Sequence, residues 1–281
     1  MNIKFSICLL LVSFFKLNAQ SVVKSPDGKL AVWVSANNGM PQYSVAYNEK
    51  NFIEKSPLGL KTNAGDFSTG LSLEKNVNQE IDESYQLPNI KKSNVHYTAN
   101  EAVFSFTKDG RPALDVIFRV SNNNLAFRYK VYPQKETLSC VVQEEASGFL
   151  MPKGTTTFLC PQSNPMTGFA RTGPSYETSY TLDDAVGKNG WGNGYTFPCL
   201  FRVNDSGWVL ISETGVDSGY CASRLIGREN GLYTIGFPMP GENNGNGTAV
   251  PGIPLPGETP WRTVTIGETL APIVETTIPF D

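Results

Sequence analysis

The feature that most limits the fold is a series of short segments in which apolar and polar side chains alternate. Across residues 95–131 three such segments follow one another, broken at Asp109-Gly110 and at Asn122-Asn123-Asn124. Alternation with a period of two puts one face of a strand on a core and the other in solvent. Because Asp-Gly favours tight hairpins, these residues predict a three-stranded antiparallel meander. Its solvated face is expected to carry the basic side chains of Arg119, Arg128 and Lys130.

Similar segments recur along most of the chain. Further strands are expected at Leu30–Val34, Tyr43–Tyr47, Thr155–Leu159, Phe197–Val203, Trp208–Glu213 and Trp261–Ile266. The 26 glycines and 19 prolines supply the turns that many short strands require. All-β sandwiches and barrels often reach 281 residues as one domain. The sequence therefore predicts an all-β chain that forms one large two-sheet antiparallel domain over residues 20–281.

The first 19 residues have the pattern of a secretory signal peptide. Lys4 precedes a short apolar run over residues 5–15, and Leu17-Asn18-Ala19 offers a cleavage site before Gln20. The run is too short to span a bilayer, and no later stretch is long and apolar enough to do so. We therefore expect an exported protein, periplasmic or extracellular, without membrane insertion.

Charge excludes one class of partner. The chain has 23 Lys and Arg against 26 Asp and Glu, a net charge of -3, and its basic residues are scattered. A nucleic-acid-binding protein would carry a clustered basic face. Nucleic acid is therefore not an expected partner.

Cysteine and histidine limit the chemistry. The mature chain has four cysteines, Cys140, Cys160, Cys199 and Cys221, and their wide spacing allows either two disulfides or buried free thiols. His96 is the single histidine and lies in a polar stretch, as expected of an exposed strand residue. One imidazole and no zinc spacing give no basis for a Ser-His-Asp, Cys-His or zinc site.

Carboxylates are the remaining candidates for chemistry. Glu177 stands between two tyrosines in Tyr176-Glu177-Thr178-Ser179-Tyr180, as a functional ligand or as a carboxylate bonded to nearby backbone. Glu213 ends an apolar strand, where it either serves a metal or stabilises the strand end or a neighbouring loop. Glu144 and Glu145 are adjacent, so in a strand they point to opposite faces and cannot share one substrate. Hydrolysis of a glycosidic bond needs two carboxylates on one substrate.

The tryptophans divide into two groups. Trp191 lies among glycines in residues 188–195, and an exposed indole there could stack on the apolar face of a sugar ring or dock on another domain. Trp208 and Trp261 lie in apolar strand patterns and are expected in the core.

Several short motifs, in order, resemble the N-terminal domain of glycoside hydrolase family 97. They are Ser25–Leu30, Ser56–Leu60, Phe118–Val120, Ala126–Tyr129, Tyr176–Tyr180, Trp208–Glu213, Tyr220 and Pro260–Arg262. Together they cover nearly all of the mature chain. The resemblance implies a β-super-sandwich similar to galactose mutarotase, which in this family precedes a catalytic (β/α)8 barrel of an exported α-glucosidase or α-galactosidase.

The resemblance also implies which functions belong to this chain and which belong to the barrel. The barrel is absent from these 281 residues, so no catalytic residue is expected in the chain, and it is not expected to be active alone. The family's active site holds calcium, with one glutamate from the N-terminal domain; Glu177 resembles that ligand, and Glu213 is a second candidate. The implied partners are the barrel and an α-linked oligosaccharide. A free-standing carbohydrate-binding module is the alternative, and a mutarotase-type epimerase is disfavoured because that chemistry needs more than His96.

Overall fold

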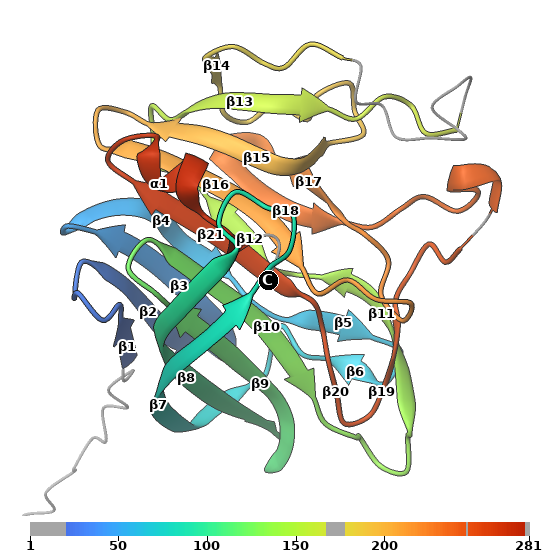
Figure 1. Cartoon of the computed structure of the whole chain (residues 1–281). Coiled ribbons are helices and arrows are strands. Elements are labelled where there is room, and N and C mark those ends of the chain that lie inside the picture. The colour runs from blue at the N-terminus through green and yellow to red at the C-terminus, as the bar shows by residue number, and fades with distance from the viewer. Residues whose placement is uncertain (1–20, 167–177, 246, 279–281) are drawn as a thin grey trace, which may run out of the picture.

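The computed structural model describes residues 21–166, 178–245 and 247–278. Strands dominate this part of the chain (Figure 1). The larger sheet has 17 strands: β1 (Ser21–Lys24), β2 (Leu30–Asn37), β3 (Met40–Tyr47), β4 (Lys50–Pro57), β7 (Ser72–Gln86), β8 (Asn94–Lys108), β9 (Arg111–Val120), β10 (Asn124–Val131), β12 (Gly148–Leu150), β13 (Thr156–Pro161), β14 (Asp184–Ala185), β15 (Tyr195–Val203), β16 (Gly207–Thr214), β17 (Arg224–Gly227), β18 (Leu232–Gly236), β20 (Gly257–Glu258) and β21 (Trp261–Gly267).

The smaller sheet and the helices complete the described chain. Four strands, β5 (Leu60–Thr62), β6 (Gly65–Asp66), β11 (Ser139–Glu145) and β19 (Gly252–Pro254), form the smaller sheet. Helix α1 (Ala271–Glu275) and 3-10 turns at Glu229–Gly231 and Glu242–Gly245 are short. Within the described ranges, no helix combines the length and apolar character needed to cross a membrane.

The larger sheet folds over on itself. Successive strands pair antiparallel in the order β1, β2, β3, β4, β12, β18, β17, β15, β16, β21, β10, β9, β8 and β7. The two ends of this order lie against each other, so that β3 faces β9 and β10. Tyr43 of β3 packs against Phe118 and Phe127, with ring centroids 5.8 and 5.4 Å apart. The buried apolar residues form one contiguous cluster. This confirms the predicted all-β, sandwich-type fold.

The meander over residues 95–131 is confirmed as β8, β9 and β10. Asp109 and Gly110 both have positive φ, 51° and 71°, as a two-residue hairpin turn requires. Phe104, Phe118 and Phe127 are buried on the inner face, while the Nε2 atom of exposed His96 lies 2.7 Å from Asp82 Oδ1. All four cysteines outside the first segment are free thiols.

Two expectations about the outer face of this sheet are wrong. Trp208 and Trp261 are not in the core, since both are half-buried on the outer face. Arg119 and Arg128 are not simply solvated, because they pair with Glu101 and Glu258 at 2.6 and 2.8 Å. The reason is pairing across strands, which brings together side chains far apart in the sequence.

Candidate functional site

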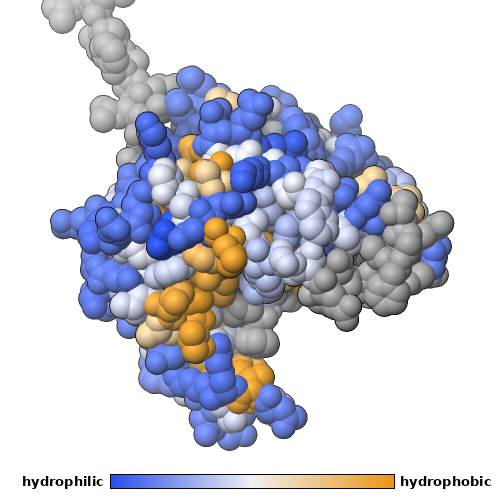
Figure 2. Space-filling model, turned by 90° about the horizontal axis from the view of Figure 1, so that it is seen from above, coloured by the Kyte–Doolittle hydropathy of each residue, from blue (hydrophilic) through white to orange (hydrophobic). Residues whose placement is uncertain are grey.

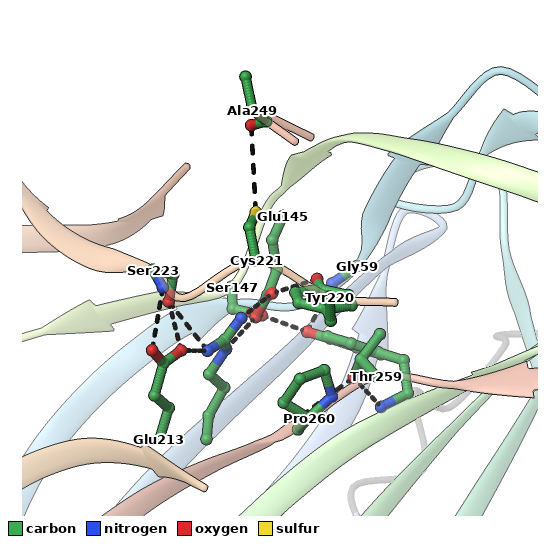
Figure 3. Close-up of polar contacts among 12 residues, drawn as sticks. Gly59, Glu145, Ser147, Glu213, Tyr220, Cys221, Ser223, Ala249, Thr259 and Pro260 are labelled. Carbon is green, nitrogen blue, oxygen red and sulfur yellow. Dashed lines mark hydrogen bonds and ion pairs between the residues drawn. The ribbon is translucent and has the colours of Figure 1, made fainter. Parts of the chain in front are cut away.

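A buried cluster of charged and hydroxyl side chains lies where β11, β16 and β21 meet the loop before β17 (Figure 3). Its centre is Arg262, whose side chain is 1% exposed. Arg262 donates from Nε to Glu145 Oε1 at 2.9 Å and from Nη2 to Glu145 Oε2 at 2.6 Å. Its Nη1 donates to Glu213 and, at 3.0 Å, to Ser223 Oγ. A bidentate guanidinium–carboxylate pair of this kind is strong and fixed in direction.

Hydroxyl groups extend the cluster to the other side of Glu145. Tyr220 donates to Glu145 Oε2 at 3.0 Å, and Ser147 donates to Oε1 at 2.9 Å. Tyr129 lies 2.6 Å from Ser147 and accepts the Gly59 amide hydrogen at 2.9 Å. Since Ser147 uses its hydrogen on Glu145, the Tyr129 hydrogen must point to Ser147. The chain of donors therefore runs in one direction, from the Gly59 backbone to the Glu145 carboxylate.

The charge states of this cluster are fixed by its surroundings. Burial alone would lower the pKa of Arg262, but the Glu145 carboxylate raises it above the ordinary value. Burial raises the pKa of Tyr129 and Tyr220, and the Glu145 charge raises both further. The guanidinium therefore stays charged and both phenols stay neutral over the physiological range. A charged pair held in this way fixes the chain segments that carry its two partners.

Glu213, one of the two candidate metal ligands, holds a loop in this structure. Its Oε1 accepts the Ser223 amide hydrogen at 2.9 Å, and its Oε2 accepts the Ser223 hydroxyl at 2.6 Å and Arg262. Both oxygens are therefore engaged inside the protein. These contacts support the interpretation that Glu213 stabilises a neighbouring loop.

Glu144 and Glu145 point in opposite directions, as the strand pattern predicts. Glu144 is exposed and pairs with Lys61 at 2.8 Å, whereas Glu145 is buried against Arg262. The two carboxylates cannot act on one substrate, so they are not a hydrolytic pair.

A pocket of about 400 Å³ lies above the cluster, between the loop over residues 215–223 and the loop over residues 237–251. Cys221 and Tyr220 line it together with Glu242, which binds Arg224. The Gly252 amide donates to the Gly219 carbonyl at 3.1 Å, which ties the two loops together. The Arg262 cluster thus forms the support of a loop-built pocket.

Of the other two predicted site residues, Glu177 and Trp191, the structure describes only Trp191. Glu177 lies outside the described residues. Trp191 is 60% exposed, on a loop that Asn189 fixes by donating to the Gly192 carbonyl at 2.9 Å and accepting from the Gly227 amide at 2.9 Å. Among the described residues no three His, Cys, Asp or Glu side chains are grouped to hold a metal ion.

The sequence contains one signal for this cluster, in strand β21. In the strand Trp261-Arg262-Thr263-Val264-Thr265-Ile266, the buried apolar positions are Val264 and Ile266. Arg262 has the same parity and must point to the same inner face. An arginine on the core face of a strand requires a buried carboxylate, and Glu145 supplies it.

Comparison with known proteins gives one family. The family model described as Glycosyl-hydrolase 97 N-terminal matches residues 23–281. A probable retaining alpha-galactosidase from Streptomyces bingchenggensis (strain BCW-1) is 28% identical over 269 residues, which are 96% of this chain and 38% of that protein.

Two solved structures show the same fold. A beta-arabinopyranosidase is 54% identical with a TM-score of 0.88, over 92% of this chain and 42% of that one. A glycoside hydrolase family 97 enzyme from Pseudoalteromonas sp. strain K8, in complex with panose, is 23% identical with a TM-score of 0.75, over 92% of this chain and 37% of that one. The chain thus spans about two fifths of the length of these relatives. It belongs to the N-terminal domain family of glycoside hydrolase family 97.

Proposed function

We propose that the chain is the non-catalytic N-terminal domain of an exported α-glycoside hydrolase and that it packs on a catalytic (β/α)8 barrel. The observation that carries this proposal is that an N-terminal family unit accounts for residues 23–281, while the relatives are more than twice as long. The geometry supports it, because Glu145 and Glu213 both bind Arg262 and are therefore engaged inside the protein.

The surface also supports packing on a second domain. Seen from above, a band of apolar side chains interrupts a largely hydrophilic face (Figure 2). Exposed apolar residues at helix α1 include Leu270, at 43%, and Val274, at 66%. Contiguous apolar surface of this kind is typical of contact regions.

The relatives suggest one class of substrate for the complete enzyme. A β-L-arabinopyranoside and an α-D-galactopyranoside share the configuration of their ring hydroxyls and differ by the hydroxymethyl group at C5. An arabinopyranosidase at 54% identity and an α-galactosidase at 28% identity are therefore chemically consistent relatives. We infer a pyranoside of this configuration as the substrate, chosen by the barrel.

The proposal includes a calcium ion that this chain and the barrel would bind together. Calcium takes six to eight oxygen ligands, and one carboxylate cannot hold it tightly. Glu177, from the resemblance, is the ligand this chain would lend, with the remaining oxygens from the barrel. Bound there, calcium would supply positive charge close to the sugar.

A turnover assay tests the proposal. The chain alone is expected to release no nitrophenol from nitrophenyl α-galactoside or β-L-arabinopyranoside, with or without calcium, and to bind calcium more weakly than about 1 mM by calorimetry. A reading frame that continues past codon 281 into a barrel with further glutamates would support the architecture. Calcium-dependent turnover by the chain alone would overturn it.

The alternative, a carbohydrate-binding module, is favoured by one observation. Trp191 presents a 60% exposed indole on a loop that is fixed by hydrogen bonds. Measurable glycan binding that is lost in W191A would support this alternative for that loop.

A further inference from the structure

A groove of about 410 Å³ lies on the outer face of the sheet, on the opposite side from the Arg262 cluster. Its floor is made of small side chains, Ala126 of β10 and Thr263 of β21, which are register partners. Arg119 is the register partner of Ala126 on β9, and Trp261 lies two residues before Thr263 on the same face. Ala126 and Thr263 are small, whereas Arg119 and Trp261 beside them are large, so a hollow remains above the two small side chains. The pairing of the strands below keeps this hollow rigid.

The far wall comes from the long β7–β8 hairpin and from the end of the described chain. Glu83, Tyr85 and Leu87 approach from β7 and the residue after it, Tyr97 from β8, and Ile278 from beyond α1. The groove is therefore lined by three aromatic rings, two aliphatic side chains and two charged groups. Its volume is in the range of small-ligand sites.

The indole of Trp261 is held in place before any ligand arrives. The guanidinium carbon of Arg128 lies 4.3 Å from its ring centroid, and that of Arg119 lies 5.2 Å away. Arg119 is anchored by Glu101 at 2.6 Å, and Arg128 by Glu258 at 2.8 Å. Cation–π contacts with anchored cations fix the ring orientation and lower the entropic cost of binding on it.

The charges of the groove disfavour an anion. Each arginine beside Trp261 is matched by its own carboxylate, and Glu83 adds a further negative charge at the rim. An anion would meet Glu83, and a wholly apolar ligand would strip water from Arg119 and Glu83 without replacing their hydrogen bonds. A pyranose suits both demands, because its C–H face is apolar and its hydroxyls are donors and acceptors.

We propose that this groove is a carbohydrate site, which binds a neutral pyranose oligosaccharide with the apolar face of one ring against the aromatic side chains that line the groove and with hydroxyls reaching Arg119 and Glu83. The site is separate from Glu177 and Trp191, and it goes beyond the proposed accessory role. It would hold glycan on the surface of the domain without cleaving it.

Titration of the chain with three probes, maltotriose, melibiose and methyl β-L-arabinopyranoside, tests the site by tryptophan fluorescence and calorimetry. At least one probe is expected to bind with a Kd of about 1 mM, since an open groove orders few groups. Changing Trp261→Ala is expected to weaken that binding about tenfold, because one aromatic wall of the groove is lost.

A second variant distinguishes a loss of ligand contacts from a loss of structure. Because W261A also removes a partner of Arg128, E83Q tests the groove at an exposed side chain and is expected to weaken binding about threefold. W191A is the matched control and is expected to bind as the unchanged chain does. Thermal unfolding of each variant confirms that it is folded.

Two results would overturn the proposal. One is no binding of any probe up to about 20 mM. The other is binding that W191A abolishes and that folded E83Q and W261A leave intact, which would place the sugar on the loop. Either result leaves the accessory role untouched, because that role is decided by the downstream barrel and by turnover.

Discussion

Trp261 and Arg262 are neighbours on β21, yet they belong to two different environments, one partly exposed and one buried. Arg262 points inward and is 1% exposed, with Glu145 and Glu213 closed around it. Trp261 points outward, where Arg128 and its partner Glu258 keep side-chain exposures of 26% and 37%. Pairs of arginine and carboxylate thus lie on both sides of the sheet around β21.

The difference teaches what each pair can do. A buried pair gains little over an apolar core, but removing one partner leaves an uncompensated charge and costs about 3–5 kcal/mol. An exposed pair contributes about 0–1 kcal/mol and is readily rearranged. The inner region therefore fixes the loops, and the outer region can exchange contacts with a ligand.

The largest effect is expected from Arg262→Met. Glu145 and Glu213 would remain in the interior without their cation, so unfolding free energy should fall by about 3–5 kcal/mol. Arg128→Met is the matched variant on the outer face and should cost about 1 kcal/mol. Denaturant unfolding of the two variants measures both values.

The double variant E145Q/R262M is the control. Removing the carboxylate together with the cation should restore part of the loss, because less charge is then stranded. If R262M and R128M cost the same, the contrast between the two faces would be refuted.

A smaller loss is expected from Tyr220→Phe. This change removes only the donor to Glu145 Oε2, at 3.0 Å, and leaves the ring beside Arg262. A hydrogen bond to a charged group contributes about 1.5–3 kcal/mol, and the bidentate Arg262 pair still satisfies the carboxylate, so about 1.5 kcal/mol is expected. Denaturant unfolding measures it, and a loss as large as that of R262M would mean that the cluster acts as one unit.

Most of the fold follows from local patterns. The turn at Asp109-Gly110 and the alternation from β8 to β10 are encoded within a few residues, so the sequence predicts them. The order of the sheet is not local. β12 pairs with both β4 and β18, which are far from it in sequence, and no short pattern specifies such pairings.

The candidate site divides in the same way. The opposite directions of Glu144 and Glu145 follow from strand geometry and are confirmed. The Arg262 cluster joins residues from 59 to 262, and the Trp261 groove joins β7, β8, β9, β10, β16 and β21, so both depend on the tertiary fold. The alternation of its strand wrongly predicts Trp261 in the core, because alternation identifies two faces but does not say what covers the second one.

The smallest expected effect concerns Cys221, at the edge of the inner region. Burial, together with the negative charge of Glu213, raises the pKa of this thiol to about 11. The unfolded thiol loses its proton near pH 9 and the folded one near 11, so the folded state binds more protons between these values. The stability that the neutral thiol contributes is therefore complete below pH 9 and is lost as pH rises to 11. Unfolding curves of the unchanged chain and of Cys221→Ser should diverge over this window by less than about 1 kcal/mol, since the thiol is only half-buried. Parallel curves would show that the burial and the Glu213 charge of the inner region do not affect the Cys221 thiol.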